Sequence, residues 1–388
     1  MASTGLLRLG WQGNLERKFE AGNSFSVIRF VPGRGGAVKG FPATEKGLLI
    51  LGRGSMSKKA FIAAVLSIFI LAAGSLAGQA KEEDQPWRWS TERIKAGVNL
   101  VRAGKNLTPK AWPNGARLAV ALSFDFDAET SALRDGQLSP GLLSQGEYAA
   151  RAALPRILAL LDRYHLPASF FVPAVTALLH PKEITAILAS GRHEIGLHGW
   201  IHERNSQLGE AEEMSLMRKS FELLKSFTGK PPVGLRTPSW DFSPFTLKII
   251  REMGLLYDSS LMADDRPYEL LENGRPTGVV ELPVEWLLDD YPYFGFDRYT
   301  AVRPQITPNE VLSIWAAEFD KAYEEGTLFV LTMHPKYIGH RSRIVMLEKL
   351  IQHMLYRGKV WFATHEDIAR VAKKALAVEK TDVRKIRK

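Results

Sequence analysis

Residues 117–127 read RLAVALSFDFD, an apolar run that ends in two aspartates. A short apolar run of this kind is typical of a buried strand. Side chains alternate between the two faces of a strand, so Asp125 and Asp127 are expected on the same side. Because two like charges on one face repel, one carboxylate could be a metal ligand and the other a base with a shifted pKa. The alternative is a polar strand end that only caps the next loop.

The rest of the chain repeats this pattern of a short apolar segment followed by a helical one. The further candidate strands are 168–174, 193–198, 233–238, 279–284, 327–334 and 359–365. Between two of them, Val311, Trp315 and Phe319 recur at the four-residue step of a helix. This alternation predicts an α/β fold with a parallel sheet of about seven strands, either closed into a barrel or doubly wound. Active sites of both architectures lie at the carboxyl ends of the strands.

The segment HEIGLHGWIHE (193–203) contains three histidines. If Gly199 begins a helical turn, His198 and His202 share a face and can chelate one ion. His193 and Glu194 are interpreted as strand residues, because H-E-I-G-L-H lacks the H-E-x-x-H spacing of zincins. A single histidine is more often a core residue, but two histidines with an aspartate form a ligand set that leaves metal positions open for water.

Two further polar residues follow predicted strands. In GLRTPSWDFSP (234–244), Arg236 could orient a carboxylate through paired hydrogen bonds or form a purely structural salt bridge. In LTMHPKYIGHRSR (331–343), His334 directly follows an apolar strand and is a candidate general acid or base.

Composition excludes several classes of site. The 388 residues include no cysteine, so there is no disulfide, no thiolate ligand and no cysteine nucleophile. Residues 1–55 and 373–388 each carry a net charge of +5, so 56–372 carries −1 of the total of +9. This distribution argues against a nucleic-acid groove and for basic tails.

Residues 56–80 have the pattern of a secretory signal peptide. Two lysines precede an apolar run, and Ser75-Leu76-Ala77 or Gly78-Gln79-Ala80 suits a signal peptidase. We expect Met56 to be the true start and 1–55 to be a non-native upstream extension. The alternative is a signal anchor over 60–77 with a basic arm, which would be the protein's only association with a membrane.

The motifs together resemble the NodB-homology polysaccharide deacetylases of carbohydrate esterase family 4. SFDFDAE, HGWIHE, RTPSW and LTMHP are similar to that family's motifs and occur in the same order, and the similarity covers about 115–372. The stretches YDSSLMADDRPYEL, PVEWLLDDYPYF and VWFATHEDIAR are closest to a subgroup of peptidoglycan deacetylase-like and allantoinase-like proteins. The resemblance implies a distorted (β/α) barrel of seven strands, in a domain over 115–372 between an N-terminal extension (81–114) and a basic tail (373–388).

The resemblance also implies a role for each site residue. Asp127, His198 and His202 would hold a divalent metal, usually zinc, with cobalt or nickel as alternatives. Asp125 would be the general base, Arg236 its orienting partner and His334 the general acid. Four residues compete as the acidic partner of His334, namely Asp258, Glu285, Asp289 and Asp290.

The expected chemistry is hydrolysis of an amide. A metal would polarise the carbonyl oxygen and lower the pKa of an attacking water, Asp125 would accept the water proton, and His334 would protonate the leaving amine. Trp240, Trp286 and Tyr293 could stack on a sugar ring, although plain packing explains such aromatics equally well.

The leading prediction is therefore a metal-dependent, periplasmic or secreted enzyme that deacetylates peptidoglycan or chitin-type sugars. A ring-opening hydrolase of cyclic imides or ureides, with or without metal, is the alternative. A non-catalytic sugar-binding protein is disfavoured, because base, ligands and acid all occur together.

Overall fold

The computed structural model describes residues 11–20, 23–32, 48–50, 85–296, 303–304 and 306–386. The chain divides into two compact units, Met1–Ser90 and Thr91–Lys388. The first unit contains an antiparallel sheet in the order β1-β2-β3, formed by β1 (Trp11–Glu20), β2 (Asn23–Pro32) and β3 (Leu48–Ile50). It also contains the short helix η1 (Pro86–Arg88). The expected signal segment, 56–80, lies outside the described residues.

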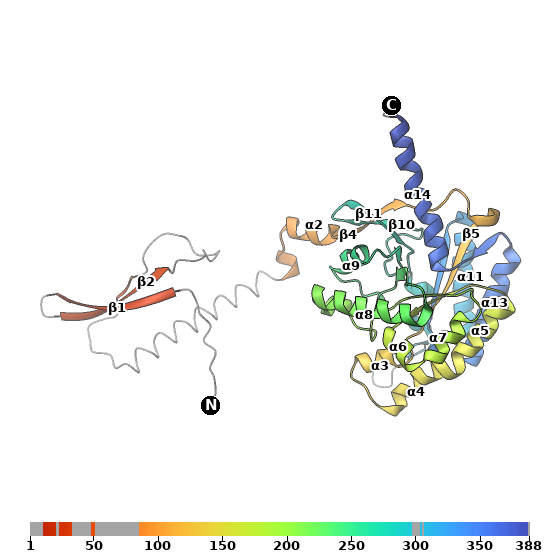
Figure 1. The fold of residues 1–388 in the computed structure, drawn as a ribbon, viewed down its shortest axis with the longest axis horizontal. Helices are drawn as coiled ribbons and strands as arrows, with labels where there is room; N and C mark the ends of the chain where they lie inside the picture. The colour runs from red at the N-terminus through yellow and green to blue at the C-terminus, as the bar shows by residue number, and fades with distance from the viewer. Residues whose placement is uncertain are drawn as a thin grey trace. The chain divides into compact units, whose positions relative to one another are not determined.

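The second unit is built on one curled, mixed sheet (Figure 1). Its strand order is β12-β5-β6-β7-β8-β9-β11-β10-β4, and β13 pairs with the first half of β5. The strands are β4 (Val101–Asn106), β5 (Leu118–Asp125), β6 (Ser169–Val172), β7 (Glu194–Leu197), β8 (Gly234–Leu235), β9 (Tyr257–Asp258), β10 (Tyr268–Glu272), β11 (Arg275–Glu281), β12 (Leu328–Met333) and β13 (Val360–Phe362).

The predicted fold class is confirmed. Each of the seven predicted segments contributes a strand, and all pairs from β12 to β11 are parallel. In the second unit three strands were not predicted: β9 is too short to show a pattern, while β10 and β4 add an antiparallel edge. β4 has mostly exposed or half-exposed residues and therefore lacks an apolar run. Across the described strands the order runs from β12 to β4 without closing, so the barrel is a half-barrel.

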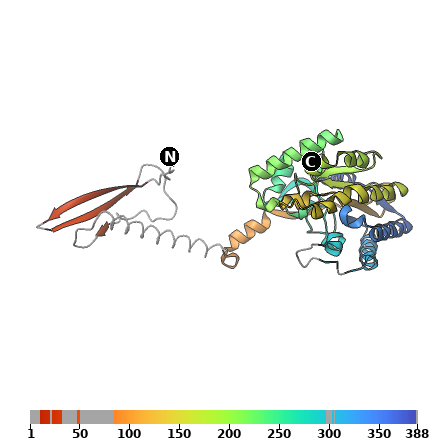
Figure 2. The same ribbon diagram turned by 90° about the horizontal axis from the view of Figure 1, so that it is seen from below.

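Helices cover the sheet, as Figures 1 and 2 show from two directions. The α-helices are α2 (Thr91–Asn99), α3 (Thr130–Arg134), α4 (Pro140–Tyr148), α5 (Leu154–Arg163), α6 (Ala174–Leu179), α7 (Pro181–Leu188), α8 (Glu210–Thr228), α9 (Thr246–Glu252), α10 (Tyr291–Phe294), α11 (Pro308–Glu325), α12 (Pro335–Ile338), α13 (Arg341–Arg357) and α14 (His365–Ile386). The π-helix η3 (Ala149–Ala153) joins α4 to α5, and short 3₁₀ helices occur at η2 (Pro113–Gly115), η4 (Asn205–Gln207), η5 (Pro238–Trp240) and η6 (Trp286–Leu288).

The helix α11 illustrates how sequence determines an element of this layer. Thr307 and Glu310 form a capping box at its start, and the left-handed Gly326 ends it. Val311, Trp315 and Phe319 are buried along one face, as their spacing predicted.

Strand β5 divides the core between the two faces of the sheet. Leu118, Val120, Leu122 and Phe124 belong to the apolar cluster that also contains the buried faces of α5, α11 and α13. The alternate residues Ala119 and Ala121 belong to a second cluster, which includes Ile368, Ala369 and Ala372 of α14. Ser123 and Asp125 continue that second face, so the period of two carries polar side chains to the carboxyl end of the strand.

The two ends of the second unit extend beyond the expected deacetylase domain. The expected N-terminal extension contributes β4 to the sheet edge, and residues 373–386 continue α14. Within the described part of the chain, no helix combines the length and the apolar character needed to span a membrane.

Candidate active site

The two aspartates of SFDFD end β5 and begin the loop after it. Both are buried, with 2% of Asp125 and 3% of Asp127 exposed to solvent. The intervening Phe126 is buried in the apolar cluster that contains Phe124, on the face of the chain opposite to the two carboxylates. Both carboxylates therefore lie on one side of the chain. The predicted alternation is therefore correct.

A loop, and not a helical turn, brings His198 and His202 together. The backbone N–H groups of Trp200 and Ile201 both donate to the Glu203 carboxylate, which stabilises the conformation of the loop. Gly199 has φ +72°, and a Cβ at that position would lie 2.9 Å from Glu203 Oε1. His202 itself has φ 65°, a conformation that costs a non-glycine residue energy and persists only where surrounding contacts enforce it.

Three side chains converge as a candidate metal centre. His198 Nε2 and His202 Nε2 lie 3.5 Å and 3.7 Å from the same oxygen, Asp127 Oδ1. His198 Nδ1 lies 2.7 Å from the Arg236 carbonyl oxygen and donates to it, which leaves the Nε2 lone pair free. Asp127 Oδ1 and His198 Nε2 are buried and have no hydrogen-bond partner among the described residues. A divalent ion would satisfy both atoms, so the donor set fits a metal.

The electrostatics of these ligands also suit a cation. Burial by itself raises the pKa of Asp127, but His202, Lys336, His334 and His198 together lower it below its ordinary value. Burial lowers the pKa of His202 to about 3, against the opposing charge of Asp127. At neutral pH the pair is therefore a carboxylate and a neutral imidazole, the forms that bind metals.

Arg236 is a fully buried guanidinium behind Asp125. Its Nη1 donates to Asp125 Oδ1 at 2.8 Å and to Ser123 Oγ at 2.9 Å. Nη2 donates to Ser259 Oγ at 2.9 Å and lies 3.2 Å from His365 Nε2, and Nε donates to the Ser259 carbonyl. Arg236 thus pairs with Asp125 and also contacts the residue after β9 and the first residue of α14. It therefore has both the orienting and the structural contacts that the sequence left open as alternatives.

His334 follows β12, and Asp290 is the acidic residue that contacts it most closely. His334 Nδ1 lies 2.7 Å from Asp290 Oδ1, compared with 3.5 Å from Asp289 Oδ1. The backbone N–H of Asp290 donates to the Thr332 carbonyl, which fixes the aspartate beside the strand end. The other candidates lie elsewhere: Asp258 bonds to Ser260, and Glu285 caps η6.

The two aspartates keep His334 protonated. Burial opposes the charged imidazole, but the charge of Asp289 and the hydrogen bond and charge of Asp290 raise the pKa of His334 to about 10. With Nδ1 committed to Asp290, the proton available for transfer is the one on Nε2.

A cavity of about 580 Å³ lies at this site. Asp125, Asp127, His202, His334 and several aromatic side chains line it. Trp240 and Trp286 both reach the cavity, with ring centroids 4.1 Å apart. Tyr293 is not among the lining residues: its hydroxyl donates to the Leu287 carbonyl and its ring packs against Trp315.

Two charged lining residues, Arg134 and Lys336, were not singled out by sequence reasoning. Lys336 stands two positions after His334, so its place near the same strand end could have been inferred. Arg134 ends α3, and no motif marks it.

The remaining residues of HEIGLHGWIHE are structural. The His193 ring packs edge-on against Phe170, and burial lowers its pKa to about 4. Glu194 accepts hydrogen bonds from Tyr257 and Ser169 in the core, and burial raises its pKa to about 7.

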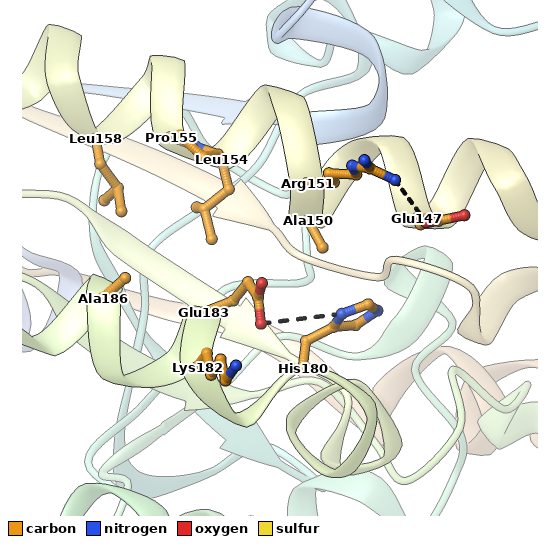
Figure 3. Close-up of a pocket in the computed structure, with 10 residues that line it drawn as sticks. All are labelled: Glu147, Ala150, Arg151, Leu154, Pro155, Leu158, His180, Lys182, Glu183 and Ala186. Carbon is orange, nitrogen blue, oxygen red and sulfur yellow. Dashed lines mark ion pairs between the residues drawn. The ribbon is translucent and has the colours of Figure 1, made fainter.

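A second hollow of about 590 Å³ lies between the α4–α5 and α6–α7 segments (Figure 3). His180 and Glu183 lie side by side on one wall, and Arg151 pairs with Glu147 on the opposite wall. None of the predicted site residues lines this hollow.

The chain is similar to known proteins in both sequence and fold. A family model described as polysaccharide deacetylase matches residues 135–257. The chain is 32% identical over 282 residues to the peptidoglycan deacetylase of Helicobacter pylori, an alignment that covers 65% of this chain and 95% of that protein. A crystal structure from Mycobacterium smegmatis, assigned as a polysaccharide deacetylase, has a TM-score of 0.64 at 35% identity and covers 70% of this chain and 96% of its own.

A second solved structure, that of Puue allantoinase, has a TM-score of 0.60 at 26% identity and covers 69% of this chain and 93% of its own. The order of motifs, the converging side chains and the extent of these similarities lead to one assignment. The chain belongs to the polysaccharide deacetylase family.

Proposed function

We propose that this protein is a metal-dependent hydrolase that removes acetyl groups from the N-acetylated sugars of peptidoglycan or a chitin-type polymer. The observation that carries the proposal is the pair of buried, unpartnered atoms Asp127 Oδ1 and His198 Nε2 beside His202. Asp127 and His202 line the same cavity as Asp125, the carboxylate held by Arg236, and the protonated His334. The Helicobacter pylori relative is named a peptidoglycan deacetylase, which supports this substrate class.

Each residue of the site has a separate task in this proposal. An ion held by Asp127, His198 and His202, with zinc proposed and cobalt or nickel as alternatives, would polarise the acetamide carbonyl and acidify the attacking water. Asp125, oriented by Arg236, accepts a proton from the water as its oxygen bonds to the carbonyl carbon. His334 donates its Nε2 proton to the nitrogen as the C–N bond breaks, which releases acetate and an amine.

Trp240 and Trp286 are proposed to contact the sugar. Trp286 is 41% exposed and lies against the nearly buried Trp240, so one aromatic face is available at the cavity. Aromatic rings commonly pack against the apolar faces of sugars in this way. Tyr291, which lines the cavity, is a better candidate than Tyr293 for a third contact.

We also propose that the protein acts outside the cytoplasm. Residues 56–80 are proposed as a signal peptide or anchor, 1–55 as an upstream extension, and 115–372 as the deacetylase domain. Sequencing the N-terminus of the native protein tests this. A mature chain that starts at Gly78 or Lys81 supports export, while an N-terminus before Met56 contradicts the proposed start.

The activity is tested with purified protein, metal analysis and three substrates: N-acetylglucosamine oligomers, peptidoglycan and a cyclic imide. The proposal predicts stoichiometric metal and acetate release that a chelator abolishes. The similarity to Puue allantoinase favours ring-opening of a cyclic ureide or imide as the second candidate. Activity on the imide that survives chelation, with no acetate release, would replace the first proposal by the second.

A further inference from the structure

Two cationic side chains contact two of the three proposed metal ligands. Lys336 Nζ lies 3.3 Å from Asp127 Oδ2, and Arg134 Nη1 lies 3.0 Å from His202 Nδ1. Both side chains line the cavity and are largely buried, with 12% and 16% exposed. Neither contact is needed to explain the proposed hydrolysis.

The position of Lys336 is built into the fold. It lies in α12, directly after His334 and Pro335, and its ammonium also donates to Ser131 Oγ at 3.0 Å. The Tyr337 ring lies beneath it, with its centroid 5.3 Å from Nζ. A positive charge is therefore held beside the carboxylate that would bind the ion, on the oxygen opposite the two histidines.

Arg134 acts on the second ligand through hydrogen bonding. Asp135 holds its guanidinium in place by two hydrogen bonds, at 2.7 and 2.9 Å. A guanidinium can only donate, so His202 Nδ1 accepts, and the hydrogen of the neutral ring then lies on Nε2. His202 Nε2 is the atom that faces Asp127, and this nitrogen must lose its hydrogen to bind a metal. His198 has the opposite arrangement, because its Nδ1 donates to a carbonyl.

We infer that Lys336 and Arg134 lower the affinity of this site for divalent metal, so that the ion is exchangeable. The inference rests on the proposed metal centre. An ion that binds here meets a neighbouring ammonium charge and displaces the hydrogen bond from Arg134 to His202. Outer-shell partners that support metal ligands typically change metal affinity by about 10- to 100-fold, and we expect an effect of similar size but opposite sign from these two cations.

The test is titration of metal-free, full-length protein with Zn²⁺ in competition with a chromogenic chelator. Lys336→Met and Arg134→Met are each expected to bind Zn²⁺ about 10- to 100-fold more tightly than the unaltered protein. Lys336→Arg keeps the charge and should keep the weaker affinity. The matched controls are Lys182→Met, in the second hollow, and Arg204→Met, which pairs with Asp135 but contacts none of the three ligands.

Two outcomes would overturn the inference, and they differ from each other. If the folded Met variants bind Zn²⁺ as weakly as the unaltered protein, the two cations do not lower its affinity. If the variants bind Zn²⁺ more weakly, the cations support the ligands. Either result shows that the inference is wrong. If no form binds Zn²⁺, or if Asp127→Ala binds it unchanged, the proposed metal centre itself fails. Circular dichroism of each variant shows whether its fold is retained.

Discussion

Asp125 and Asp127 have different side-chain partners, although only one residue lies between them in the sequence. Asp125 accepts from Arg236, whereas Asp127 Oδ1 faces two imidazole nitrogens. We expect Asp127→Ala to lose bound metal, and Asp125→Asn to keep the metal but lose about 100-fold or more in kcat. Metal content and the rate of acetate release measure the two effects separately. Full activity of both variants would show that the site is wrongly assigned.

His334 should set the alkaline limit of activity through its pair with Asp290. Asp289 and Asp290 raise the pKa of His334 to about 10, so the imidazole stays protonated until the pH rises through that value. Asp290→Asn removes a bonded negative charge, lowers the pKa of His334, and moves the alkaline limb of kcat/KM to lower pH by about one unit or more.

The control for this pH prediction is Glu285→Gln. Glu285 is an exposed carboxylate of the same segment and caps η6 without contacting His334. Its profile should match that of the unaltered protein. An alkaline limb that stays in place in Asp290→Asn would remove His334 from the role of acid.

At the scale of elements, the segment from η6 to α10 contributes Trp286, Asp289 and Tyr291 to the cavity wall. Trp286 is 41% exposed, so its truncation should cost little stability. We expect Trp286→Ala to raise KM for an N-acetylglucosamine oligomer about three- to tenfold, with kcat nearly unchanged, because an aromatic contact is worth about 0.5–1.5 kcal/mol. Tyr293→Phe lies outside the cavity and should leave both constants unchanged. An equal effect of the two substitutions would contradict the proposed sugar platform.

Strand β8 shows how close packing places Arg236. A Cβ at Gly234 would lie 1.9 Å from the Tyr257 ring, whose hydroxyl is bonded to the buried Glu194. Gly234→Ala should therefore lower the free energy of unfolding by about 1–3 kcal/mol, as measured by denaturant unfolding.

The matched control for Gly234 is Gly97→Ala in α2. No atom lies within 4 Å of its added Cβ, and alanine favours a helix over glycine by up to about 1 kcal/mol. This variant should be as stable as the unaltered protein or more so. Two glycine variants of equal stability would show that the Tyr257 ring moves aside freely.

At the scale of the whole molecule, the three proposed ligands come from two segments that only the folded sheet brings together. Asp127 follows β5, and both histidines follow β7. An ion that binds only the native state should raise the free energy of unfolding by about 2.7 kcal/mol at a hundredfold excess over its Kd. Thermal unfolding with and without Zn²⁺ measures this, and Asp127→Ala should show no shift. An unchanged melting temperature of the unaltered protein would contradict a native-state metal site.

The architecture followed largely from periodicity. Alternating strands and helices predicted the parallel sheet, because buried strands and amphipathic helices leave local patterns in the chain. β9 and β4 left no such pattern, since two residues are too few to show alternation and a half-exposed edge needs no apolar run. The pairing of β10 with β4 depends on contacts between segments more than 150 residues apart, such as Tyr268 with Asn106.

The chemistry of the site divides in the same way. Residue types and their places after strands were enough to propose Asp125, Asp127, His198, His202, Arg236 and His334 as one site, because parallel strands bring their carboxyl ends to one edge. Only the tertiary structure selected Asp290 as the partner of His334, placed Tyr291 in the cavity in place of Tyr293, and brought Lys336 and Arg134 against the ligands. Such pairings are decided by which loops meet across the sheet, and loop conformations depend on contacts that are distant in sequence.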